Sequence, residues 1–204
     1  MSKPIGRLHV ITDSLETAAA TLAAGAPVVQ VRGKRHTDAE VYELTCRVVE
    51  LAAPYGATVI VNDRPDVAVA ACADGVHLGA QDLPLAAGRR VIGPDLLLGG
   101  TARDPETARA HELDGADFLG VGPTFATTSK DGLPPPLGAA WVGAVAAAVD
   151  IPVIAIGGID ATRVPELLDA GVHGVAVIGA VAHASDPSAA TERLLRLLER
   201  AEAG

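Results

Sequence analysis

Aromatic residues are scarce in this sequence of 204 residues, at 2% of the total, whereas 49% of the residues are hydrophobic. The core must therefore be aliphatic, and no set of rings is visible on which single-stranded bases could stack. Basic residues are also outnumbered, since Lys and Arg total 16 against 25 Asp and Glu, which gives a net charge of −9. An acidic excess spread along the chain disfavours nucleic-acid and anionic-membrane partners. We expect neither kind of partner.

Cysteine is scarce as well, because Cys46 and Cys72 are the only two and have no metal-ligand spacing. Two cysteines are too few for a disulfide scaffold, so we interpret both as small, buried or half-buried hydrophobic residues in a reducing compartment. The apolar runs are short and are broken by Asp, Pro or Gly, which predicts no membrane span. The first predicted strand leaves no room for a signal peptide before it. These features together predict a cytoplasmic protein.

Short apolar runs alternate with longer stretches of helical periodicity about eight times along the chain. The predicted strands are Leu8–Ile11, Val28–Val31, Val59–Val61, Gly75–Leu78, Leu96–Leu98, Phe118–Val121, Val153–Ile156 and Gly174–Ile178. The clearest predicted helices are Asp38–Ala53, Asp104–Leu113, Asp160–Ala170 and one that opens at Asp186-Pro187. Continuous apolar runs are typical of parallel strands buried on both faces. The pattern predicts an α/β protein with a single (β/α)8 TIM barrel over residues 1–204, and a doubly wound open sheet is the alternative.

Polar residues follow most of the predicted strands, and in a barrel these strand ends meet at one mouth. Gln30 and Arg32 lie two residues apart and therefore share a face of the second strand, and Lys34 follows them. The donor fork of an arginine and the point charge of a lysine both suit phosphate. A surface basic cluster is the alternative interpretation.

Carboxylates follow the next two strands. Asn62 and Asp63 end the third strand, and Asp82 follows the fourth. Two carboxylates and an amide from neighbouring strands form a hard-oxygen site suited to Mg²⁺ that also binds substrate phosphate. The alternatives are an Asn-Asp turn and an aspartate that caps the next helix.

Two further regions of the mouth suit anions. The loop Thr127-Thr128-Ser129-Lys130 after the sixth strand offers hydroxyls and a lysine that could wrap a pyrophosphate, with a solvated loop as the alternative. Gly157-Gly158 and Ile178-Gly179 end the seventh and eighth strands, where backbone N–H groups form the usual phosphate site of a barrel, with simple turns as the alternative. Two separate anion sites fit an enzyme that joins a diphosphate substrate to a monophosphorylated one.

No Ser-His-Asp or Cys-His arrangement is apparent. We interpret the scattered histidines as structural, although His9 and His77 lie on predicted strands and are the least secure in that interpretation.

Several segments together resemble a known family. They are Leu8–Asp13, Gln30–Lys34, Val61–Arg64, Gly75–Gly79, Asp82–Pro84, Gly115–Asp117, Gly122-Pro123, Thr127–Lys130 and Ala155–Ile159. On these segments the chain resembles thiamine-phosphate synthase and its relative, thiazole tautomerase, nearly from end to end.

The resemblance implies a transferase of thiamine biosynthesis with a TIM-barrel fold. It would join hydroxymethylpyrimidine diphosphate to thiazole phosphate, or to its carboxylate, and release pyrophosphate. Residue by residue, the resemblance implies the following roles: Gln30 holds the pyrimidine; Arg32, Lys34, Asn62 and Lys130 bind pyrophosphate; Arg32, Lys34 and Lys130 are catalytic; Asp63 and Asp82 hold Mg²⁺; Thr101, Thr127 and Ser129 contact the substrates; Gly158, Ile178 and Gly179 bind the thiazole phosphate. The partners are then small phosphorylated molecules, and a homo-oligomer is compatible with the sequence.

Two positions depart from the family pattern. His9 stands where the synthase usually has an aromatic residue, which bears on how the pyrimidine packs. Arg103 stands where the tautomerase has its acid/base histidine, and Asp82 is a carboxylate that the tautomerase commonly lacks. The residues at positions 82 and 103 both favour the synthase. The tautomerase, an isomerase, and a non-catalytic sensor of thiazole or thiamine phosphate are the alternatives.

Overall fold

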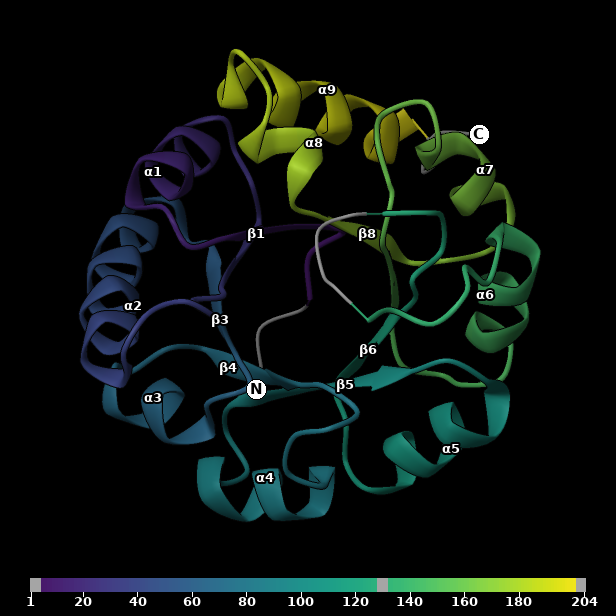
Figure 1. The fold of residues 1–204 in the computed structure, drawn as a ribbon, viewed down its shortest axis with the longest axis horizontal. Coiled ribbons are helices and arrows are strands. Elements are labelled where there is room, and N and C mark those ends of the chain that lie inside the picture. Colours follow the sequence, from purple (N-terminus) through teal and green to yellow (C-terminus); the bar gives the residue numbers. More distant parts are fainter. Residues whose placement is uncertain (1–4, 128–131, 201–204) are drawn as a thin grey trace.

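A closed barrel of eight parallel strands stands at the centre of the molecule (Figure 1). The computed structural model describes residues 5–127 and 132–200. Each strand pairs with the next, and β8 pairs with β1 to close the barrel. The strands are β1 Leu8–Thr12, β2 Val28–Val31, β3 Thr58–Asn62, β4 Gly75–Leu78, β5 Leu97–Ala102, β6 Phe118–Val121, β7 Val153–Ile156 and β8 Gly174–Val177. The predicted (β/α)8 TIM barrel is confirmed.

Helices surround the barrel on the outside (Figure 1). They are α1 Leu15–Ala23, α2 Asp38–Ala52, the short 3₁₀ helix η1 Ala53–Tyr55, α3 Pro65–Ala70, α4 Leu85–Ile92, α5 Pro105–Leu113, α6 Ala139–Ala146, α7 Val164–Asp169, α8 Gly179–Ala182 and α9 Pro187–Arg200. The predicted starts at Asp104 and Asp186 are confirmed, because their carboxylates accept hydrogen bonds from the N–H groups of Thr107 (2.8 Å) and Ala189 (3.0 Å).

Several predicted boundaries differ from the structure by one residue, and two were wrong by more. The fifth strand was predicted to end at Leu98, but β5 continues through Gly99 and Gly100 to Ala102. Glycines usually signal a turn, yet here the ladders to β4 and β6 on either side keep them extended. The seventh helix was predicted to start at Asp160, but α7 begins at Val164. The Asp160 carboxylate accepts from the N–H of Thr162 (2.8 Å), which forms a local turn before the helix.

The core has two layers because successive strand residues point to opposite faces. The larger layer fills the space between the strands and the helices, and includes Leu8, Val10 and Val76. A smaller cluster fills the inside of the barrel: Ile5, Ile11, Val28, Ile60, Leu97, Phe118, Ile154 and Ala176. This cluster fills the barrel below the mouth at the carboxyl ends of the strands. Of the two cysteines, Cys46 is half-buried as predicted, but Cys72 is exposed, so the prediction of a buried or half-buried residue was wrong there. Within the described part of the chain, no helix is long and apolar enough to cross a bilayer.

Candidate active site

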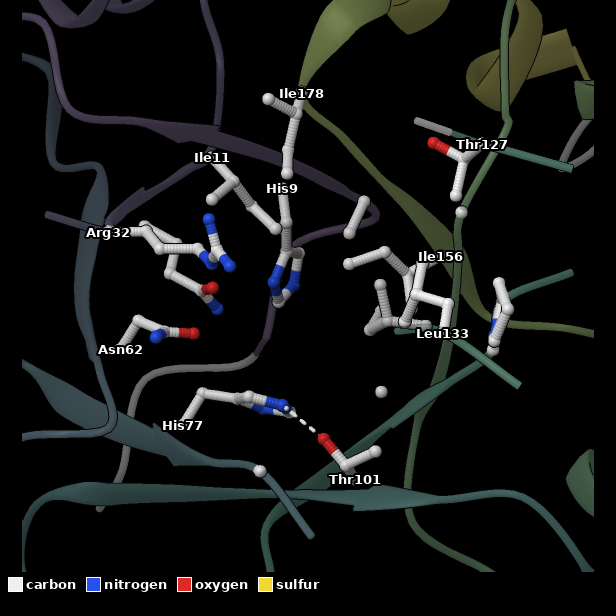
Figure 2. Close-up of a pocket in the computed structure, with 18 of the residues that line it drawn as sticks. His9, Ile11, Arg32, Asn62, His77, Thr101, Thr127, Leu133, Ile156 and Ile178 are labelled. Carbon is white, nitrogen blue, oxygen red and sulfur yellow. Dashed lines mark hydrogen bonds between the residues drawn. The ribbon is translucent and has the colours of Figure 1, made fainter. Parts of the chain in front are cut away.

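A cavity of about 630 Å³ opens at the carboxyl ends of the strands (Figure 2). Every predicted site residue that the structure describes lines it: Gln30, Arg32, Lys34, Asn62, Asp63, Asp82, Thr101, Thr127, Gly158, Ile178 and Gly179. Ser129 and Lys130 lie outside the described residues. The barrel thus brings together residues that are far apart in the sequence.

The cationic side of the cavity is built by β2 and β3. Gln30 pairs with Ile60 across the two strands, and its amide is almost completely buried. Arg32 lies two residues after Gln30 and therefore also faces inward. Its backbone N–H donates to the carbonyl of Thr12 (2.9 Å). Figure 2 shows Arg32 and Asn62 on the opposite side of the cavity from Thr127. A cationic wall therefore faces the β6–α6 loop across the cavity.

Asp63 is held in an unusual backbone conformation at the end of β3. Its φ angle is 65°, in the left-handed region that a non-glycine residue rarely adopts. Its N–H donates to the carbonyl of His77 (2.8 Å), and its carboxylate forms an ion pair with the ammonium of Lys34. Backbone strain of this kind clusters at functional sites. The conformation directs the Asp63 carboxylate towards the end of β4.

The carboxyl groups of Asp63 and Asp82 meet above Gly79. The N–H of Gly79 donates to Asp82 Oδ2 (2.7 Å). A Cβ atom on Gly79 would lie 2.8 Å from Asp82 Oδ2 and 4.0 Å from Asp63 Oδ1, so only glycine leaves room for the pair. Both carboxyl groups therefore lie beside Gly79 at the end of β4, as expected for neighbouring strands, and their predicted binding of one cation stays a prediction.

Proximity shifts the pKa values of the two aspartates in opposite directions. Burial raises the pKa of Asp63, but the hydrogen bond with Asp82 and the ammonium of Lys34 outweigh it and hold that pKa below its usual value. Burial and the hydrogen bond with Asp63 raise the pKa of Asp82. The opposite directions mean that each carboxyl group responds to the other, and two carboxylates at close range are favourable only when positive charge lies nearby.

The carboxylates of Asp63 and Asp82 fit a Mg²⁺ ion whose other ligands are water and substrate phosphate. Among the described residues, no group of three or more His, Cys, Asp or Glu side chains could hold a metal by itself. Mg²⁺ commonly takes one or two protein carboxylates and completes its shell with water and substrate phosphate. Asp63 and Asp82 can supply those carboxylates, beside the cationic groups of Arg32 and Lys34.

The other side of the mouth is built from backbone. Gly157 and Gly158 follow β7, and Gly158 has a φ angle of 66° that favours glycine. β8 is followed by α8, a short extra helix that begins at Gly179. The N–H groups of Val181 and Ala182 donate to the carbonyl of Ile178 (3.2 and 2.9 Å), which leaves the N–H groups of Gly179 and Ala180 as the candidates for binding an anion. A barrel phosphate site commonly uses a short helix in this position. All three predicted phosphate-binding residues, Gly158, Ile178 and Gly179, line the cavity, and their role in phosphate binding stays a prediction.

Two histidines form part of the cavity floor, where sequence reasoning assigned no function. His9 and His77 are inward-facing residues of β1 and β4, and both contact the Phe118 ring. Burial, followed by the charge of His77, lowers the pKa of His9 to about 3. Burial lowers the pKa of His77 to about 4, against the opposing effect of Asp63. Both rings are therefore neutral near pH 7. In the sequence, His9 and His77 each alternate with apolar residues that face outward, and this alternation could have predicted that both histidines face into the barrel.

Arg103 anchors the β6–α6 loop at the rim of the cavity. Its guanidinium donates to the carbonyls of Gly122 (3.2 Å) and Pro135 (2.9 Å), on the two arms of the loop. Its own carbonyl accepts from the indole N–H of Trp141 (2.8 Å). Arg103 thus ties β5, the loop and α6 together. An always-protonated arginine cannot perform the acid/base role of a histidine.

The mouth of this TIM barrel combines a carboxylate pair, cationic side chains and glycine-rich backbone. These features are typical of barrel enzymes that act on phosphorylated substrates. A family model described as thiamine monophosphate synthase matches residues 6–181. A thiamine-phosphate synthase of Salinispora arenicola (strain CNS-205) is 52% identical over 203 residues, covering 95% of this chain and 98% of the relative. One from Moorella thermoacetica (strain ATCC 39073 / JCM 9320) is 44% identical over 188 residues, covering 92% and 90%.

A solved structure agrees with these relatives. The thiamine phosphate pyrophosphorylase from Pyrococcus furiosus superposes with a TM-score of 0.89 at 38% identity, covering 96% of each chain. The chain belongs to the thiamine monophosphate synthase family. The resemblance that the sequence motifs indicated is confirmed.

Proposed function

We propose that this chain is a thiamine-phosphate synthase, a transferase that joins hydroxymethylpyrimidine diphosphate to thiazole phosphate with release of pyrophosphate. Relatives with this name that are up to 52% identical along nearly the whole chain support the proposal. The structural observation that supports it is that the two sides of one cavity are built differently, each in a way that suits an anion. Charged side chains from β2, β3 and the end of β4 line one part, and glycines after β7 and β8 line the other.

The chemistry needs little covalent participation from the protein. Heterolysis of the diphosphate leaves a pyrimidine carbocation that its own amino group stabilises. Arg32 and Lys34 would neutralise the developing charge on the departing pyrophosphate, and the buried amide of Gln30 would hold the pyrimidine. The glycine-built site would place the thiazole nitrogen in line with the reacting carbon. No general base is required.

We further propose that Asp63 and Asp82 hold Mg²⁺ when the diphosphate is present. The supporting observation is the meeting of their carboxyl groups above Gly79. A bound Mg²⁺ would add positive charge to the leaving pyrophosphate. Lys34 would then exchange its ion pair with Asp63 for a phosphate oxygen. The Lys34 side chain, about half exposed, has the freedom to make this exchange.

The tautomerase is the less favoured alternative. Its acid/base position is filled by Arg103, whose donors are committed to two carbonyls of the β6–α6 loop. The proposed partners of the chain are small phosphorylated molecules, and we propose neither a nucleic-acid nor a membrane partner. The proposed location is the cytoplasm. A homo-oligomer stays a prediction, and measuring the molar mass in solution would test it.

The decisive experiment incubates the protein with both substrates and Mg²⁺ and measures thiamine phosphate and pyrophosphate together. Equal amounts of the two products are expected, and absence of both would refute the proposal. Asp82→Asn should lower the rate by at least ~10-fold, since it removes a proposed metal ligand. Asp95→Asn, at an exposed aspartate outside the cavity, is the matched control and should keep full activity. Isomerisation of the thiazole carboxylate without Mg²⁺ would instead support the tautomerase.

A further inference from the structure

His77 makes one hydrogen bond inside the barrel and leaves its other ring nitrogen without a partner. Nε2 lies 2.9 Å from the hydroxyl oxygen of Thr101, on the neighbouring strand β5, as the dashed line in Figure 2 shows. Nδ1 is fully buried and has no hydrogen-bond partner among the described residues. Both side chains line the cavity. The neutral ring carries one proton, and its position decides the direction of the bond to Thr101.

The surroundings of Nδ1 favour a bare nitrogen there. A side chain on Gly99 would lie 2.7 Å from Nδ1 and would collide with the edge of the Phe118 ring. Nδ1 therefore lies against Gly99, which offers only C–H groups on that side, and the Phe118 ring, which has no hydrogen-bond acceptor atom, lies beside His77 with the ring centroids 5.7 Å apart. A lone pair is compatible with such neighbours, whereas a buried N–H without an acceptor is rare in native proteins. The proton then belongs on Nε2.

A proton on Nε2 fixes the role of the Thr101 hydroxyl. Nε2–H donates to Thr101 Oγ1, so the hydroxyl acts as the acceptor in that bond. No other hydrogen bond of this hydroxyl is present among the described residues. Its own hydrogen is thus free to point into the cavity. The opposite tautomer would consume that hydrogen in the bond to His77 and would leave only lone pairs facing the ligand.

We propose that His77 is a positioning residue that acts through Thr101. Protonated on Nε2, it turns the Thr101 hydroxyl into a hydrogen-bond donor towards the substrate. The group that it recognises is an acceptor, either a phosphate oxygen or an unprotonated ring nitrogen of the diphosphate substrate. This proposal rests on the proposed function for the identity of the substrate, but the tautomer itself does not depend on activity.

Nitrogen NMR of uniformly ¹⁵N-labelled protein without substrate tests the tautomer directly. The His77 resonances, identified by their loss in His77→Gln, should show a protonated Nε2 and an unprotonated Nδ1. A proton on Nδ1 would overturn the proposal even if the protein is an active synthase. Conversely, the expected tautomer in a protein without synthase activity would leave the geometry intact and refute only the proposed function.

A double-mutant cycle tests whether His77 acts through Thr101. His77→Phe should lower kcat/KM by ~10-fold in the wild-type background and by less than ~2-fold in the Thr101→Val background. Equal losses in both backgrounds would contradict the proposal. If His77→Phe does not fold, His77→Gln, which retains an N–H donor of similar reach, takes its place and should keep much of the activity that an apolar residue loses.

His111 is a matched control because it contacts the same residue by a different group. Its Nε2 lies 3.1 Å from the backbone carbonyl of Thr101, and it does not line the cavity. His111→Gln should therefore leave kcat/KM unchanged and show no coupling to Thr101→Val. Coupling as large as that of His77 would mean that the effect is transmitted by the strand backbone, and would overturn the proposed role of the hydroxyl.

Discussion

His9 is buried in the floor of the barrel, and its titration predicts that the protein loses stability in mild acid. Burial, the nearby His77 ring and, to a lesser extent, His173 oppose protonation, and only the carbonyl of Gly6 favours it. The folded pKa of about 3 lies below the ordinary histidine value of 6.5. Between these two pH values, His9 binds a proton in the unfolded chain but not in the folded chain. Stability from this residue is therefore present above about pH 6.5 and is lost as the pH falls towards the folded pKa.

The size of the effect follows from linkage. At about pH 5 an ordinary histidine in the unfolded chain is almost fully protonated, while His9 in the folded chain is not. The free energy of unfolding should then be about 2 kcal/mol lower at about pH 5 than at about pH 8 because of His9 alone. That loss is a substantial part of the 5 to 15 kcal/mol, roughly, that stabilises a typical domain.

Urea unfolding at several pH values measures the prediction. His9→Gln removes the titrating ring, so its stability should fall by about 2 kcal/mol less between about pH 8 and about pH 5 than that of the wild type. His36→Gln, at an exposed histidine, is the matched control and should follow the wild type. Other acidic groups contribute equally to all three proteins. If His9→Gln shows the wild-type pH dependence, His9 either takes up a proton in the folded barrel or is not buried, and the reasoning fails.

Three further predictions follow from individual contacts. Gly79→Ala would place a methyl group against the Asp82 carboxylate, and Mg²⁺ titrations of activity should show at least ~10-fold weaker apparent metal affinity with little loss of stability. Arg103→Met removes two hydrogen bonds to the β6–α6 loop, which should raise KM and shift the fluorescence of Trp141; unchanged values for both would contradict its anchoring role. Arg89→Met removes hydrogen bonds to the carbonyls of Leu96 and Gly115 and the ion pair with Asp117, at the opposite end of the barrel, so it should cost about 2 kcal/mol in urea unfolding while kcat stays unchanged.

Local patterns determined most of the fold. Apolar runs bounded by Gly, Asn and Asp predicted the strands, and the aspartates before Pro105 and Pro187 predicted two helix starts that the structure confirms. These signals depend on side-chain period and on capping within a few residues, so they are visible without a tertiary structure. The prediction failed at β5, where Gly99 and Gly100 are extended only because strands on both sides pair with them.

The sequence by itself also determined which residues line the mouth, because in a barrel every strand ends at the same face. Only the tertiary structure decided how they meet. The carboxyl groups of Asp63 and Asp82 converge because Gly79 leaves room above the end of β4. His77 and Thr101, 24 positions apart in the chain, become hydrogen-bond partners because β4 and β5 are neighbours in the closed sheet. Such contacts depend on closure and register, and no local pattern encodes them.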